Sequence, residues 1–147
     1  MSRIISFRGL MQSGDIETLR MSTNKGLIGY RITKFQLFPH KPGSQDAEDV
    51  MKIYKTPQST ADNVVDFSDQ RLIAASFLTA GASIAYSYSE AVVFDLEKVN
   101  QDLYITYTDT NSADKQCNYY IEMEQMALNI DEQTVATLKD IRNTGTQ

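Results

Sequence analysis

The segments Leu103-Tyr-Ile-Thr-Tyr-Thr108 and Cys117-Asn-Tyr-Tyr-Ile-Glu-Met-Glu124 alternate side chains between two faces, one of them largely apolar. A period of two residues is typical of extended strands that have one buried and one solvated face. The polar residues 109–116 between the two segments are typical of a turn. This stretch therefore predicts a β-hairpin inside a mostly antiparallel protein.

The rest of the chain predicts further short strands separated by turns. We expect strands at residues 3–11, 16–21, 27–38, 49–55, 64–67, 70–78 and 83–88, and in the alternation of Val92, Phe94 and Leu96. The first two of these are expected to pair with each other, and residues 70–78 are also compatible with a helix. Near the carboxyl terminus, Asp131 and Gly145 can bound a short amphipathic helix whose apolar residues are Val135, Leu138 and Ile141.

Two breaks in the alternation predict bent strands. Tyr30 and Ile32 share one parity, whereas Phe35 and Leu37 share the other, and a second switch is expected near Gln125. Such a switch is typical of a β-bulge or of a strand that crosses between two sheets. With turns at intervals of roughly 8–12 residues, we expect an all-β, antiparallel two-sheet sandwich. The sandwich is expected to be jelly-roll-like and to form one domain over residues 1–147.

Composition limits the classes of function. The 147 residues include 41% hydrophobic and 22% charged residues and carry a net charge of −5, which favours a globular domain. The basic residues are spread singly, so we expect no nucleic-acid partner. Residues 72–89 lack charge but are too polar to favour a bilayer, and we expect no membrane association. One cysteine and no apolar signal-peptide core predict folding in a reducing cytoplasm.

No catalytic, metal-binding or cofactor-binding set is expected. The single histidine, His40, lies in a proline-flanked turn, and no Gly-x-Ser-x-Gly motif or cysteine pair is present. The glycines are isolated at turns rather than gathered in a phosphate-binding loop. Glu122 and Glu124 share one strand face and resemble a glycosidase carboxylate pair, but we expect them to be the solvated side of a strand.

Two groups of residues are candidates for ligand or interface contacts. Asp109, Asn111 and Asp114 loosely resemble the start of a calcium loop, but the glycine and the closing glutamate of that motif are missing. A solvated turn also explains these residues. Tyr104 and Tyr120 lie on the outward parity of their strands, where tyrosine stacks on sugars, anchors protein interfaces or forms ordinary cross-strand pairs.

The segments Asn100-Gln-Asp-Leu-Tyr-Ile-Thr106 and Cys117–Glu124 resemble small structural proteins of tailed bacteriophages, over residues 91–142. The resemblance implies a non-enzymatic virion protein that works by association, such as a capsid cement or decoration subunit or a tail component. Its expected partners are further copies of itself, for example in a trimer, and a major capsid or tail protein. The alternative is a carbohydrate-binding β-sandwich module that uses Tyr104, Tyr120 and the loop at residues 109–114.

Overall fold

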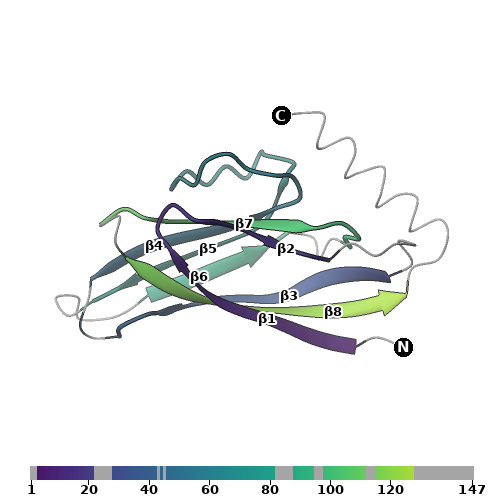
Figure 1. Cartoon of the computed structure of the whole chain (residues 1–147), viewed down its shortest axis with the longest axis horizontal. Coiled ribbons are helices and arrows are strands. Elements are labelled where there is room, and N and C mark those ends of the chain that lie inside the picture. The colour runs from purple at the N-terminus through teal and green to yellow at the C-terminus, as the bar shows by residue number, and fades with distance from the viewer. Residues whose placement is uncertain are drawn as a thin grey trace.

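The computed structural model describes residues 3–21, 28–42, 44, 46–81, 88–94, 98–111 and 115–127. Two antiparallel sheets pack on one another as a sandwich, which confirms the predicted all-β class (Figure 1). One sheet has the order β1-β8-β3, with strands β1 (Arg3–Gln12), β8 (Gln116–Ala127) and β3 (Ile28–Pro39). The other has the order β2-β7-β4-β5-β6, with strands β2 (Ile16–Leu19), β7 (Leu103–Asp109), β4 (Ala47–Tyr54), β5 (Leu72–Ala80) and β6 (Tyr88–Val93).

Strands account for all the regular structure of the described residues, and no helix occurs among them. No helix in this part of the chain is therefore long and apolar enough to cross a membrane. The helix expected near the carboxyl terminus lies outside the described residues, as do most of the residues of the strand expected at 83–88.

The inward faces of the two sheets form a common core, and the alternation of β7 and β8 is confirmed. The side chains predicted to be buried are buried on both strands: Leu103, Ile105 and Tyr107 on β7, and Cys117, Tyr119, Ile121 and Met123 on β8. Side chains of opposite parity on each strand point to the outer surface of its sheet.

The predicted hairpin between these two strands is wrong, because β7 and β8 belong to different sheets. The expected pair formed by the first two strands is wrong for the same reason, since β1 pairs with β8 and β2 pairs with β7. An alternating pattern fixes which face of a strand is buried, but the same pattern arises whether the next strand lies beside it or across the core.

The observed pairs are nested along the chain. The first strand pairs with the last, the second with the seventh, and the fourth with the fifth, while β3 and β6 contact each other. A long hairpin of eight strands that is rolled up on itself has these neighbours. Strands from opposite ends of the chain therefore lie side by side.

The connections that cross between the sheets are bonded together at one corner of the sandwich. Gly14, with a φ of 94°, forms the tight turn after β1, and its N–H donates to the carbonyl of Tyr107 at 2.9 Å. The N–H of Ser13 donates to the carbonyl of Lys115, and the Ser13 hydroxyl accepts from the N–H of Asp109. The turn after β1 and the connection after β7 thus hold each other in place.

The parity switch predicted within β3 is confirmed as a bulge. Ile32 lies opposite Met123 and Lys34 opposite Glu122, so Thr33 is the extra residue. The Thr33 hydroxyl donates to the carbonyl of Glu122 at 3.1 Å. The switch expected near Gln125 is wrong, because the pairing of β8 with β3 continues through that position without a shift, and the pairing with β1 reaches it without one.

A long loop between β4 and β5, residues 55–71, holds to the outer face of the five-stranded sheet through Lys52. This side chain is 2% exposed, and its Nζ donates to Asp62 Oδ1 at 2.7 Å and to the carbonyl of Val64. The strand expected at 64–67 is therefore wrong, because these residues belong to the loop.

The strand expected at 70–78 is confirmed as β5, and the strand expected around Val92 begins earlier and ends at Val93.

Gly9 gives room for the ring of Tyr119, which passes beneath β1. A Cβ at Gly9 would stand 2.8 Å from Cε2 and from the hydroxyl of Tyr119. That hydroxyl donates to Glu17 Oε2 on β2 at 2.8 Å, which links the two sheets at their β1–β2 side.

We expect Gly9→Ala to lower the free energy of unfolding by about 1–3 kcal/mol, because the ring must shift or β1 must lift from it. In a Tyr119→Ala background, where the ring is gone, the same substitution is expected to cost much less. Urea unfolding of the two single variants and the double variant measures this coupling. Additive effects would contradict the close approach of ring and backbone.

Candidate functional site

The outer face of the three-stranded sheet presents regular rows of side chains across its strands. Tyr120 of β8 lies between Arg8 of β1 and Gln36 of β3. Asn118 lies in the same way between Leu10 and Phe38. All six residues have outward parity, because the inward positions of β8 are filled by the core.

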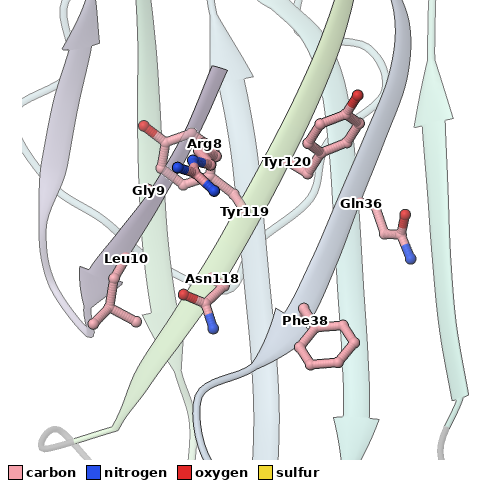
Figure 2. A pocket seen from close by; sticks show the side chains of 8 residues that line it. All are labelled: Arg8, Gly9, Leu10, Gln36, Phe38, Asn118, Tyr119 and Tyr120. Atoms are coloured by element: carbon pink, nitrogen blue, oxygen red, sulfur yellow. The ribbon is translucent and has the colours of Figure 1, made fainter. Parts of the chain in front are cut away.

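These two rows border a surface depression of about 590 Å³ (Figure 2). It is lined by Arg8, Gly9, Leu10, Gln36, Phe38, Asn118, Tyr119 and Tyr120. Phe38 is 57% exposed and Leu10 is 41% exposed, so the lining offers apolar surface beside two amides and a guanidinium. Such a mixture suits a ligand or partner with both apolar and hydrogen-bonding groups.

The side chain of Tyr120 is held by its neighbours on the next row. Its hydroxyl donates to Glu122 Oε2 at 3.0 Å, and this hydrogen bond raises the tyrosine pKa. The Nζ of Lys34 lies 5.8 Å from the centre of the Tyr120 ring. These contacts fix the ring at the border of the depression.

Glu122 and Glu124 both lie on this outer face, on the central strand of the sheet rather than on an edge. Glu122 accepts the Tyr120 hydroxyl, and Glu124 forms an ion pair of 2.9 Å with Arg31. Each carboxylate thus has its own partner on the surface.

The structure does not bring Tyr104 and Tyr120 together. Tyr104 lies on the five-stranded sheet, opposite Thr18 of β2 and Tyr54 of β4, and it is half-buried. Burial raises the pKa of its hydroxyl, with a further contribution from Asp102. Because the two tyrosines lie on the outer faces of different sheets, a single ligand site cannot use both.

The residues that resemble the start of a calcium loop do not form one exposed site either. Asp109 is 5% exposed and points into the sandwich at the end of β7, where its Oδ1 accepts the N–H of Asn111 at 2.6 Å. Asn111 is exposed, and Asp114 lies outside the described residues. Asp109 therefore holds the connection after β7 from inside rather than offering an oxygen to solvent.

Asp109 and Asp49 form a buried acid pair beneath the corner of the sandwich. The two residues lie opposite each other on β7 and β4, and Asp49 is 1% exposed and Asp109 5% exposed. Tyr107 adds a hydrogen bond of 2.5 Å from its hydroxyl to Asp49 Oδ1.

Burial and the neighbouring Asp109 raise the pKa of Asp49 to about 7, although the hydrogen bond from Tyr107 acts in the opposite direction. Burial also raises the pKa of the Tyr107 hydroxyl and of the Cys117 thiol, and the charge of Asp49 adds to both. The thiol of Cys117 lies 3.6 Å from the carbonyl oxygen of Phe38. These groups form a polar cluster that is closed to solvent.

Sequence reasoning missed both Asp49 and the depression. The signal for Asp49 was present, because it shares the parity of Met51 and Ile53, two buried residues of β4. The depression gave no local signal in the sequence, since its lining comes from three strands whose neighbours are fixed only by the topology.

His40 follows β3 and is half-buried. No group of three or more His, Cys, Asp or Glu side chains among the described residues is arranged to hold a metal ion.

The sequence matches no family model, and no curated protein matches it. Function has therefore to be inferred from the sandwich and its surfaces.

We expect the buried acid pair to make stability depend on pH. The folded protein keeps the Asp49 proton up to a pKa of about 7, whereas the unfolded chain releases it near 3.8. The stabilising contribution is thus complete below pH 3.8 and is lost as the pH rises to about 7, and it amounts to at most about 4 kcal/mol. Asp49→Asn, which mimics the protonated acid, is expected to remove this dependence. Urea unfolding between pH 4 and pH 8 measures it.

The control is Glu48→Gln, which changes an exposed carboxyl on the same strand. Its stability is expected to follow the pH dependence of the wild type. If Asp49→Asn kept the wild-type slope, the acid pair would not be the cause.

Proposed function

We propose that this protein is a non-enzymatic structural component of a virus particle, made in the host cytoplasm, that acts by self-association and by binding other particle proteins. A capsid cement or decoration subunit is the specific role we infer, with a major capsid or tail protein as the partner. The observation that carries the proposal is the nested pairing of the strands, together with the uncovered apolar side chains on both outer faces.

The strand order supports a jelly-roll architecture. A jelly roll is an eight-stranded double sheet made of two Greek keys, and it is used by viral capsid proteins and by lectins. Pairing of the first strand with the last, the second with the seventh and the fourth with the fifth is the order that such a roll requires. One departure is that β6 extends the five-stranded sheet beside β5, while it also contacts β3.

Apolar side chains on both outer faces support a subunit with several neighbours. On the three-stranded sheet, Ile4 and Phe38 are each 57% exposed. On the five-stranded sheet, Phe77 and Tyr88 are exposed and their ring centres lie 5.6 Å apart. Contiguous exposed apolar surface, such as the pair formed by Phe77 and Tyr88, marks interaction sites, and a subunit within a shell must contact more than one neighbour.

We expect the purified protein to form assemblies of at least twice the 16.6 kDa chain mass, because these apolar surfaces need partners. Phe38→Lys or Phe77→Lys is expected to reduce assembly, whereas Gln36→Lys adds the same charge without removing apolar area. Light scattering coupled to size exclusion, from about 1 to about 100 μM, gives the mass. A chain that stays monomeric throughout would contradict self-association.

A second candidate function, carbohydrate recognition, is favoured by the depression on the three-stranded sheet. Phe38 and Tyr120 offer aromatic faces, and Gln36, Asn118 and Arg8 offer hydrogen-bonding groups beside them. Aromatic rings with polar groups at their rim are suited to sugar rings, which have both apolar and hydroxyl-bearing faces. The site then consists of Tyr120 with these neighbours, without Tyr104 and Asp109.

If this second function holds, a glycan array is expected to show binding that falls about tenfold or more in Phe38→Ala or Asn118→Ala, from the loss of stacking or of a hydrogen bond. Phe77→Ala, on the other sheet, serves as the control. Removal of calcium with a chelator is expected to leave binding unchanged, because Asp109 is buried. Binding that was lost in the control but kept in Phe38→Ala would exclude the depression.

A further inference from the structure

Among the described residues, the two sheets end on four edge strands, and β1 differs from the other three. β2 has only four residues, and β6 contacts β3. β3 carries the bulge at Thr33, ends on Pro39 and is bridged to Val99 at Tyr30. β1 has ten residues that pair with β8 without a bulge, and it contains no proline. Proteins normally shorten, bend or cover their sheet edges, so an edge left long and regular needs a partner.

The free hydrogen-bonding groups of this edge can be identified from the turn after β1. Both the N–H and the C=O of Gln12 bond to Asp15 in the turn rather than to β8. In an antiparallel ladder the residues alternate between the two sides of a strand. Leu10, Arg8, Ser6 and Ile4 therefore direct their backbone groups away from β8, and no described segment pairs with them.

We propose that β1 pairs antiparallel with β1 of a second copy across a two-fold axis at Phe7, so that two three-stranded sheets become one sheet of twice the width. In this register Ile4 lies opposite the partner's Leu10, and Ser6 lies opposite the partner's Arg8. The free backbone groups of the two edges then face each other, as an antiparallel ladder requires. This pairing at β1 depends on the self-association proposed above.

The side chains select this register over its neighbours. Ile4 is 57% exposed and Leu10 is 41% exposed, and both lie on the outer face, so pairing them with each other covers apolar surface on both copies. An axis at Arg8 would oppose two guanidinium groups, and an axis at Ser6 would oppose Ile4 to Arg8. An axis nearer either end would leave much of the strand unpaired.

The inner side of the strand fits the same arrangement. Phe7 and Ile5 are partly buried against the core at the margin of the sandwich. The register brings Phe7 to the partner's Phe7 and Ile5 to the partner's Gly9, which has no side chain of its own. The contact thus pairs Phe7 with Phe7, and it places Ile5 of one copy over Gly9 of the other, next to the Tyr119 ring.

A charge exchange tests both the surface and the register. Ile4→Lys with Leu10→Lys places lysine opposite lysine twice in the dimer, and we expect the apparent dissociation constant to rise at least about tenfold. Ile4→Lys with Leu10→Glu places opposite charges across the axis and is expected to restore association. Within one copy the two positions stand about 20 Å apart along the strand, so restoration must come from the partner. Sedimentation equilibrium of the full chain measures the constant.

The control is Asn63→Lys with Gln70→Lys, which adds two positive charges at exposed positions of the loop between β4 and β5, away from β1. It is expected to associate like the wild type. The proposal falls if the double-lysine variant associates normally, or if the lysine–glutamate variant stays as weak as the double-lysine variant. If assembly is abolished only by Phe38→Lys or Phe77→Lys, self-association stands and the β1 edge is excluded. A wild-type chain that stays monomeric overturns both the proposed self-association and the proposed pairing at β1.

Discussion

The position of β8 between β1 and β3 is the constraint on which the rest of the structure depends. β8 pairs along its length with a strand from the beginning of the chain on one side and with β3 on the other. Its inward residues, Cys117, Tyr119, Ile121 and Met123, fill the middle of the core. Once its register is set, the rows on the outer face follow. No other described strand pairs with the far side of β1, and the depression forms above Tyr119. Because such pairs join distant parts of the chain, their loop-closure entropy is lost before the contacts form.

The sequence predicts the faces of strands better than their neighbours. The alternation of Leu103, Ile105 and Tyr107 identified the buried side of β7, and the parity switch after Ile32 identified the bulge of β3. The neighbours of β7 and β8 were not predictable from the sequence, because a connection of the same polar composition can turn within one sheet or cross to the other sheet. The depression could not be predicted for the same reason. Asp49 could have been, since its parity placed a carboxyl among buried residues.

One polar contact inside the sandwich joins the two sheets, and a second joins neighbouring strands. The Tyr119 hydroxyl reaches Glu17 on the opposite sheet, whereas Tyr107, Asp109 and Asp49 lie together on β7 and β4 of the five-stranded sheet, beside the crossing connections. Apolar side chains tolerate small shifts between packed faces, whereas a buried hydrogen bond has a preferred distance and direction. An acid kept protonated by its surroundings costs stability when the pH rises. The cluster of Asp49, Tyr107 and Asp109 thus fixes the side chains of β4 and β7 at the corner, at the cost of stability at high pH.

The two outer faces and the β1 edge have different consequences for assembly. Pairing across a two-fold axis at β1 closes on itself and ends at a dimer. A shell needs further contacts, and the exposed Phe77 and Tyr88 lie on the other sheet, away from that axis. The same pairing would place two depressions on one continuous face, because Arg8 and Leu10 belong both to β1 and to the lining. A repeating ligand, whether a surface lattice of proteins or a polysaccharide, would then be held at two points, and each point raises the effective concentration at the other. The edge therefore matters under either function, because it turns a shallow site with few contacts into a bivalent surface.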